Sequence, residues 1–301
     1  MLAKIENVTK IIEKKVIIDN ISFTLHEGEI VALVGPNGAG KTTLLGSITN
    51  ILKINSGTII INGIDMKKNP DKALEHISFM QDNSTLYPHI SGYQHLKFVA
   101  KLKGKNPHHL DSIIKKLKIQ KYINDKVSSY SLGMKQHLLF AIALIAEPKL
   151  LIMDEPLNGL DPTGSLLVRE LILDLKSKGT TILFSSHLLD EIDKISDRLI
   201  FIKDGKVVAT KDLKELGGDK TKTYILKVKE IKKAMDILNN IDEVMKVDAI
   251  GPDTLQIEFS NCEISKIIQI CAINGVDILD IEKRTIQTEL AYHHLIGANH
   301  E

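Results

Sequence analysis

Several features that would assign this chain to a special class are scarce or missing. It has only two cysteines, Cys262 and Cys271, too few for a disulfide framework, so we expect buried, reduced thiols. The formal net charge of +1 gives no electrostatic basis for nucleic-acid binding. The longest apolar run, Leu138 to Ala146, is far shorter than the ~20 residues of a membrane-spanning helix, and the N-terminal residues show no apolar signal-peptide segment. We therefore expect a cytosolic protein that does not itself cross a membrane.

A glycine-rich loop is the most informative feature that is present. The spacing Gly, four residues, Gly-Lys-Thr occurs in Gly35, Pro36, Asn37, Gly38, Ala39, Gly40, Lys41, Thr42 and Thr43. A buried-strand pattern precedes the loop at 30–34 and a helical pattern follows at 42–48, a context that counts against a chance match. Glycine lets backbone N–H groups wrap a polyphosphate, and the helix N-terminus adds partial positive charge. The pattern predicts that Lys41 reaches the β- and γ-phosphates and that the Thr42 hydroxyl binds Mg²⁺.

The longer, N-terminal part of the chain has the pattern of an α/β domain. Apolar strand segments alternate with helical ones across residues 1–215, which predicts a mainly parallel sheet with helices on its faces. Between about 83 and 147 the period is helical, so we expect a helical subdomain there. Asn62-Gly63 and Asp204-Gly205 each lie between two apolar segments and predict hairpin turns, hence an antiparallel part as well.

The C-terminal part has a different order of elements. After a linker at 216–220, residues 221–301 read strand, helix, strand, strand, helix, strand, with the last strand at 276–281. This order predicts a small α+β domain of the split βαβ, ferredoxin-like type. A short helix at 286–295 is expected to follow.

Two carboxylates, Asp154 and Glu155, end the apolar strand segment 150–153. A carboxylate at the C-terminal end of a strand beside a phosphate loop can hold Mg²⁺ through a water molecule, which suits Asp154. Glu155 can orient or deprotonate the water that attacks the γ-phosphate. The alternative is an acidic pair that caps a helix, although the following Pro156 makes a plain capping box less natural.

A Ser-x-Gly turn lies upstream of this strand. Ser131, Leu132 and Gly133 open the apolar helix that runs from Met134 to Ala146. Serine is a good N-cap, so plain helix capping is one interpretation. The other is a second phosphate site, again at a helix N-terminus.

Taken in order, these segments resemble the nucleotide-binding domain of ABC transporters. The set consists of the phosphate loop, Gln81, the signature Ser131-Leu132-Gly133-Met134-Lys135-Gln136, Asp154-Glu155, Asn158-Gly159-Leu160-Asp161 and Ser185-Ser186-His187. The resemblance covers roughly residues 1–215. It is greatest to the ATPases of ABC-2-type exporters, including the bacitracin-resistance and lantibiotic-immunity group, in which a small C-terminal domain follows. It implies a P-loop NTPase fold with a mainly parallel core sheet, an antiparallel β subdomain and a helical subdomain.

The resemblance also implies roles for individual residues at an ATP site. The nucleotide would be held by Gly35, Asn37, Gly38, Ala39, Gly40, Lys41, Thr42 and Thr43. Thr42 and Gln81 would bind Mg²⁺, with Asp154 behind a water. Glu155 would be the catalytic base, and His187 would contact the γ-phosphate. Taken singly, Gln81 would be an ordinary surface glutamine and His187 a structural histidine.

Further implied roles concern partners. Ser131 and Gly133 would reach the ATP held by a second nucleotide-binding subunit, and Asp161 would lie at the interface of this head-to-tail homo- or heterodimer. An integral-membrane permease would be the other partner, and the chain would meet the membrane only through it, on the cytoplasmic face. In the family, the region 87–93 borders the groove for a permease helix; a plain surface loop is the alternative.

Four positions depart from the family pattern. The signature more often has Gly-Gly-Gln where this chain has Leu132-Gly133-Met134, and His137 stands where arginine is common. The aromatic residue that normally stacks on adenine falls near Ile12, which is aliphatic. Base stacking is therefore expected to be weak, and nucleotide selectivity with it.

The sequence thus predicts the ATP-hydrolysing subunit of an ABC exporter, with drugs, antibiotics or antimicrobial peptides as the type of cargo. The first alternative is a non-transport ABC ATPase acting on ribosomes or DNA. Such proteins usually carry two nucleotide-binding domains or a long coiled-coil insertion, and we find neither in this sequence. The second alternative, a regulator with a decayed site, conflicts with the presence of Glu155 and the whole phosphate loop.

Overall fold

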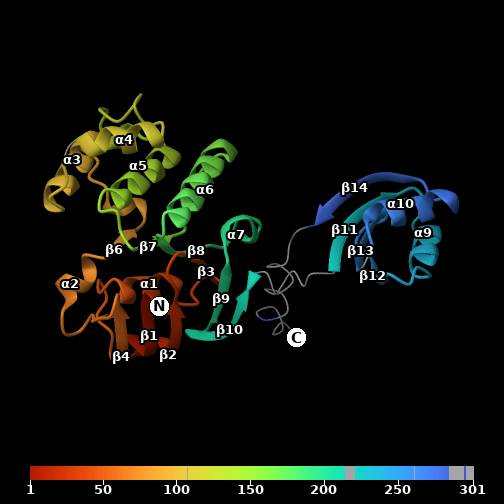
Figure 1. The fold of residues 1–301 in the computed structure, drawn as a ribbon, viewed down its shortest axis with the longest axis horizontal. Coiled ribbons are helices and arrows are strands. Elements are labelled where there is room, and N and C mark those ends of the chain that lie inside the picture. Colours follow the sequence, from red (N-terminus) through yellow and green to blue (C-terminus); the bar gives the residue numbers. More distant parts are fainter. Residues whose placement is uncertain (107, 214–220, 261, 285–294, 296–301) are drawn as a thin grey trace. The chain divides into compact units, whose positions relative to one another are not determined.

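The structure of this protein is a computed structural model that describes residues 1–106, 108–213, 221–260, 262–284 and 295 (Figure 1). The chain divides into two compact units, Met1–Asp212 and Leu213–Ala291, and each is described here by itself. The predicted linker at 216–220 lies outside the described residues. So does the predicted helix at 286–295, except for its last residue.

A six-stranded sheet forms the centre of the first unit. Its strand order is β10-β9-β3-β8-β7-β6, and all neighbours are parallel except β10, which is antiparallel to β9. The strands are Ile30–Val34 (β3), Ile77–Met80 (β6), Leu150–Asp154 (β7), Thr181–Ser185 (β8), Arg198–Lys203 (β9) and Lys206–Asp212 (β10). The inner strands β3 and β8 are buried along their whole length, as expected when both faces of a sheet are covered. The predicted, mainly parallel sheet is confirmed.

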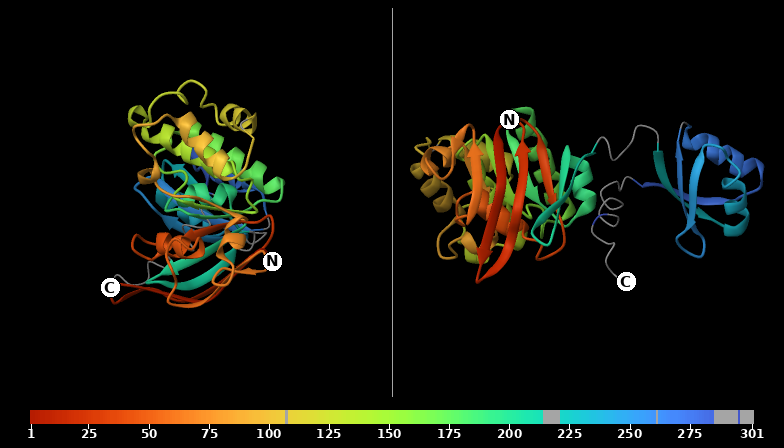
Figure 2. Two further views of the ribbon diagram at one scale, coloured as in Figure 1. Left: turned by 90° about the vertical axis from the view of Figure 1, so that its left-hand side faces the viewer. Right: turned by 90° about the horizontal axis from the view of Figure 1, so that it is seen from below.

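A second, antiparallel sheet covers helix α1, Lys41–Ile48. Its strands, in the order β2-β1-β4-β5, are Lys15–Leu25 (β2), Ala3–Ile12 (β1), Ser56–Ile61 (β4) and Ile64–Asp65 (β5). The right-hand view of Figure 2 shows β1 and β2, in red, across one face of the unit. Leu44, Leu45 and Ile48 of α1 are fully buried in a core that draws residues from both sheets. The helix that follows the phosphate loop is therefore fixed by packing on two sides.

Both predicted hairpin turns are present. Asn62 and Gly63 connect β4 with β5, and Asp204 and Gly205 connect β9 with β10, in each case between antiparallel strands. All four residues have positive φ angles, as a two-residue type I′ turn requires.

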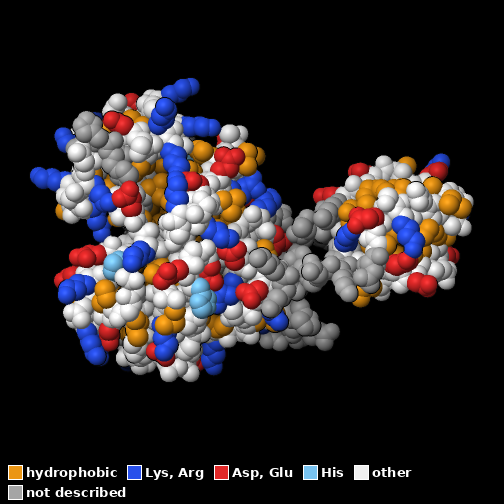
Figure 3. All heavy atoms as spheres, viewed as in Figure 1, with side chains coloured by type: hydrophobic (Ala, Val, Ile, Leu, Met, Phe, Trp, Pro, Cys, Tyr) orange, Lys and Arg blue, Asp and Glu red, His pale blue; other side chains and the backbone are white. Residues whose placement is uncertain are grey.

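Helices occupy the region between β6 and β7. They are Asn83–Thr85 (η1), Gly92–Leu102 (α3), His108–Lys116 (α4), Val127–Ser129 (η2) and Leu132–Leu144 (α5). Of these, α5 packs against both α3 and β6. In the view of Figure 3, Lys and Arg side chains stand out on the surface of this region. The remaining helices of the unit are Pro70–Leu74 (α2), Pro162–Ser177 (α6) and Leu189–Ile195 (α7).

The second unit contains a four-stranded antiparallel sheet in the order β12-β13-β11-β14. Its elements are Thr221–Val228 (β11), Ile231–Leu238 (α9), Val244–Ala249 (β12), Thr254–Ser260 (β13), Ile264–Ile273 (α10) and Ile278–Arg284 (β14). The predicted split βαβ order is confirmed. The last strand begins at Ile278 instead of Val276, because the N–H of Val276 bonds to the carbonyl of Cys271 and closes the end of α10.

Candidate functional site

The phosphate loop joins β3 to α1. Gly40 precedes the helix with φ at 99°, and a Cβ atom there would lie 2.8 Å from Ile18 Cδ1 and 2.9 Å from the Ile17 carbonyl oxygen, so only glycine fits. Gly40 also offers no side chain to cap the helix. The first N–H groups of an α-helix have no partners within it, so those of α1 are available for an anion.

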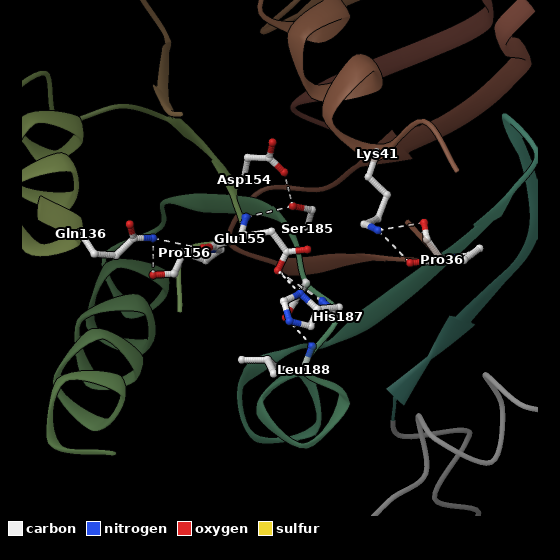
Figure 4. A network of polar contacts seen from close by, with 11 residues as sticks. Pro36, Lys41, Gln136, Asp154, Glu155, Pro156, Ser185, His187 and Leu188 are labelled. Atoms are coloured by element: carbon white, nitrogen blue, oxygen red, sulfur yellow. Dashed lines mark hydrogen bonds and ion pairs between the residues drawn. The ribbon is translucent and has the colours of Figure 1, made fainter. Parts of the chain in front are cut away.

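Lys41 is the buried cation of this loop. Its side chain is 7% exposed, and its Nζ donates to the carbonyl oxygens of Gly35 at 2.7 Å and Pro36 at 3.2 Å. Burial lowers the pKa of Lys41 from its ordinary value, while the carboxylates of Glu155 and Asp154 act in the opposite direction. Figure 4 shows Lys41 on one side of the site and the two carboxylates on the other.

One serine hydroxyl connects the two carboxylate residues at the end of β7. The register of β7 and β8 pairs Asp154 with Ser185. Ser185 Oγ donates to Asp154 Oδ1 at 2.5 Å and accepts from the N–H of Glu155 at 3.0 Å. Helix α6 is capped by Asp161, whose Oδ1 accepts from the N–H of Gly164 at 2.7 Å, and not by the Asp154-Glu155 pair. The helix-capping alternative for this pair is therefore wrong.

Glu155 and His187 are in direct contact. Glu155 Oε2 lies 2.8 Å from His187 Nδ1 and also accepts from the His187 backbone N–H at 3.3 Å. Because a carboxylate only accepts, Nδ1 carries the hydrogen in this arrangement. The side chains of Glu155 and His187 are 25% and 49% exposed, so a water molecule or a ligand can reach both.

The signature segment begins helix α5. Ser131 is the N-cap, and its Oγ accepts from the N–H of Met134 at 3.2 Å, so the capping bond is present, while the phosphate site at the same helix end stays a prediction. Five residues further on, the side chain of the buried Gln136 points from the helix toward the end of β7. Its Nε2 donates to the carbonyl oxygens of Glu155 at 3.1 Å and Pro156 at 2.9 Å. Figure 4 shows this connection between the signature helix and the end of β7.

Leu132 and Gly159 form a second connection between these segments. Gly159 has φ at 76°, and a Cβ atom there would lie only 2.1 Å from Leu132 Cδ2. Leucine at the signature position thus occupies the space that a side chain at 159 would need. Leu132, which departs from the family signature, therefore contacts a loop that has glycine at position 159.

His137, the third departure, lies behind the signature. Its Nδ1 is 3.3 Å from the hydroxyl of Tyr122, and its buried Nε2 has no hydrogen-bond partner among the described residues. Burial lowers the pKa of His137, while Asp161 acts in the opposite direction. His137 and Asp161 line one pocket together with Ser131 and Gly133.

Two predicted residues lie farther from this network. Met80 pairs with Met153, so Gln81 follows β6 at the same sheet edge as Asp154, where it lines an apolar pocket. Ile12 ends β1 opposite Lys15 and is 38% exposed. No described contact joins either residue to the phosphate loop, and their roles stay predictions.

Sequence reasoning assigned no role to Ser185 or to Gln136 itself. Ser185 could have been found from the strand ends, since parallel neighbours place Asp154 and Ser185 at the same edge. For Gln136, the signal was an amide at the start of an otherwise apolar helix, since a buried amide needs a partner.

The described side chains suit a nucleotide with Mg²⁺. They contain no cluster of three or more His, Cys, Asp or Glu residues that could hold a metal. Mg²⁺ that is bound together with phosphates needs only one or two protein ligands and keeps several waters. The exposed Thr42 and the second carboxylate oxygen of Asp154, which Ser185 does not contact, fit that requirement.

Comparison with known proteins identifies the family. A family described as "ABC transporter" matches residues 18–158. Over 99% of its length the chain is 33% identical to the uncharacterized ABC transporter ATP-binding protein YhcH of Bacillus subtilis, and the match covers 97% of that protein. The chain belongs to the ABC transporter ATP-binding proteins. It is an ABC-type ATPase, as the sequence motifs predicted.

Other relatives of this ABC ATPase have more specific names. The lantibiotic transport ATP-binding protein SrtF of Streptococcus pyogenes is 37% identical over 70% of this chain and 91% of its own length. The linearmycin resistance ATP-binding protein LnrL of B. subtilis is 34% identical over 71% of each chain. Among solved structures, an "ATP binding subunit of ABC transporter" aligns with a TM-score of 0.67 and 26% identity, over 72% of this chain and 92% of that one. The predicted ABC fold is confirmed.

The helices of the structure also bear on membrane crossing. Within the described ranges, no helix of this ABC ATPase combines the length and the apolar character that a membrane span needs.

Proposed function

We propose that this ATPase uses Mg²⁺-ATP to drive export of an antibiotic or antimicrobial peptide through a separate integral-membrane permease. The names of SrtF and LnrL support this type of cargo for those two proteins. The nearly full-length match to YhcH supports a shared architecture that includes the C-terminal unit. The cargo itself is selected by the permease, so this chain supplies the energy for transport and not the specificity.

The contact between Glu155 and His187, opposite Lys41, is the observation that carries the catalytic part of this proposal. Lys41 exchanges its two carbonyl partners for the β- and γ-phosphates of ATP. Glu155 accepts the proton of the attacking water, and His187 holds the carboxylate in place until the γ-phosphate arrives. Thr42 and Gln81 would bind Mg²⁺, with Asp154 behind a water, and the bound metal would neutralise charge at the phosphates.

A second nucleotide-binding subunit completes the site. Ser131 and Gly133 lie in an open pocket together with Asp161, and the nearby Leu132 and Leu166 are each 49% exposed. Exposed apolar side chains around a polar helix N-terminus suit a surface that closes on another subunit. The dimer is a homodimer or pairs this chain with a related one.

The permease binds beside helix α3. An apolar pocket there is lined by Phe79, Leu86 and Val99 among others, and its rim carries Tyr87 at 65% and Phe98 at 56% exposure. Exposed aromatic side chains over an apolar pocket are typical of an interface with another protein. The groove predicted near 87–93 is therefore our site for a permease helix.

Co-purification tests this assignment. We expect the chain to be recovered from membranes together with a polytopic membrane protein, and Phe98→Asp to abolish this recovery. Leu102→Asp is the matched control, because Leu102 is on the same helix, is 68% exposed and does not line the pocket. Recovery with ribosomes or DNA, and not with a membrane protein, would contradict export and indicate a non-transport function. Equal recovery of both variants would show that the permease contacts another surface of the chain.

A further inference from the structure

The backbone of Glu155 has an unusual conformation. Its φ angle is 49°, in the left-handed region that side chains other than those of Asn and Asp seldom adopt. Such a conformation persists only where the surrounding groups hold it, and it is often found where a functional side chain has to be aimed. The groups that hold Glu155 therefore determine where its carboxylate points.

Ser185 holds Glu155 from the N-terminal side. The hydroxyl is on the fully buried strand β8, accepts from the Glu155 N–H at 3.0 Å and donates to Asp154 Oδ1 at 2.5 Å. A hydroxyl has one hydrogen and two lone pairs, so it can make both bonds at once. The same oxygen thus sets the start of the left-handed turn and the orientation of the neighbouring carboxylate.

Gln136 holds Glu155 from the C-terminal side. Its Nε2 donates to the carbonyl oxygens of Glu155 and Pro156, which are the next two acceptors along the chain. Gln136 is 5% exposed, so water does not replace these bonds easily. Because Gln136 is on α5, it ties the helix that starts at Ser131 to the catalytic strand end.

We propose that Ser185 and Gln136 are positioning residues that together hold Glu155 in its left-handed conformation and so aim its carboxylate at the attacking water. This inference rests on the proposed role of Glu155 as the base. Among the described residues, Gln136 bonds only to backbone carbonyl oxygens, so its loss lowers kcat and leaves ATP binding unchanged. Loss of Ser185 lowers kcat and also frees the Asp154 carboxylate, so it weakens binding of Mg²⁺-ATP as well. Gln136 additionally makes the aim of Glu155 depend on the position of the signature helix.

The test compares Ser185→Ala and Gln136→Met with matched controls. Thr181→Val is the control for the serine, since Thr181 is on the same strand, is fully buried, accepts from the N–H of Gly28 at 2.9 Å and donates to the carbonyl of His26 at 3.0 Å. Gln256→Met is the control for the glutamine, since Gln256 is 8% exposed and belongs to the second unit. Each full-length variant is measured for kcat, KM for ATP, binding of a fluorescent ATP analogue and melting temperature.

We expect Ser185→Ala and Gln136→Met to lower kcat at least ~5-fold relative to their controls, because displacements of about 1 Å in a catalytic group cost up to ~10²-fold. For Gln136→Met, KM and analogue binding should stay within about twofold of wild type. A smaller difference in kcat, or an equal fall in the controls, would overturn the proposal. If Ser185→Ala does not fold, Gln136→Met decides the question alone.

Glu155→Gln, measured in parallel, separates the two proposals. If Glu155→Gln hydrolyses ATP slowly while Ser185→Ala and Gln136→Met hydrolyse it normally, Glu155 is the base but Ser185 and Gln136 do not position it. Normal hydrolysis by Glu155→Gln removes Glu155 from its role.

Discussion

The two units of this chain differ in where they bury polar groups. The first unit buries Lys41, Gln136 and Ser185 in and around one sheet edge. Among the described residues of the second unit, Gln256 is the one buried polar side chain. Among the described non-glycine residues with left-handed φ angles, Glu155 lies at this edge, whereas Asn62 and Asp204 lie in hairpin turns.

This contrast shows what the chemistry of the first unit requires. Buried polar groups reduce stability unless every partner is present, and a reaction that needs fixed charges is one reason to keep them. The second unit has an apolar core, in which Leu226, Ile257 and Phe259 are fully buried, and this is enough for a stable fold. The contrast supports our proposal that catalysis belongs to the first unit.

The largest expected effect tests catalysis at the strained strand end. Glu155→Gln should hydrolyse ATP at least ~10²-fold more slowly, the usual scale for loss of a general base, while still binding ATP. The slow variant should accumulate as an ATP-bound dimer, which size-exclusion chromatography would show. Turnover close to that of the wild type would mean that the buried polar network of the first unit serves stability alone.

A smaller effect concerns the base of the nucleotide. Ile12 and Ile11 are 38% and 39% exposed and aliphatic, so we expect ATP affinity to depend mainly on the triphosphate and Mg²⁺. GTP should then compete with ATP within about tenfold, which corresponds to ~1 kcal/mol of missing stacking. Ile12→Tyr should tighten binding of both nucleotides slightly. Strong rejection of GTP in a competition titration would reveal an adenine contact elsewhere.

A still smaller effect concerns pH. Burial lowers the pKa of His137, so the unfolded chain takes up a proton near the ordinary pKa of ~6.5 that the folded chain does not. The melting temperature of the wild type should therefore fall as the pH drops below about 6.5. That of His137→Gln should fall less, by a difference on the order of 1–2 °C. His26→Gln, at an exposed position, is the control. Parallel melting curves for wild type and His137→Gln would exclude this contribution.

The smallest expected effect is that of removing the second unit. Truncation after Gly218 should leave a folded protein whose ATP affinity matches that of the full chain, because the phosphate loop and every other proposed ATP-site residue lie within Met1–Asp212. Titration with a fluorescent ATP analogue measures this, and circular dichroism confirms folding. A folded truncation that no longer binds ATP would show that the two units are not separable in function.

Much of the fold could be predicted from local pattern. Strand β3 is a continuous apolar run, the centre of β8 is apolar, and Asn62-Gly63 dictates its turn through backbone preference alone. The end of α10 was less predictable, because the apolar Val276 fits a strand equally well and only its hydrogen bond to Cys271 settles the boundary.

The site was predictable where residues follow the phosphate loop or a strand end, as Lys41 and Asp154 do. The hydrogen bonds that support these residues were not predictable. The contact of Ser185 with Asp154 depends on the register of two strands that are distant in sequence, and that of Gln136 with Glu155 depends on where α5 packs. Pattern and spacing do not contain this information, because it arises from tertiary packing.

The contact between Leu132 and Gly159 restricts how this sequence can diverge. Any side chain at 159 has to adopt a left-handed backbone and displace Leu132 Cδ2, so a single substitution there meets two obstacles at once. A smaller residue at 132 removes the steric obstacle but leaves the left-handed backbone. A library that varies position 159 should therefore return mainly glycine, even when residue 132 is varied with it.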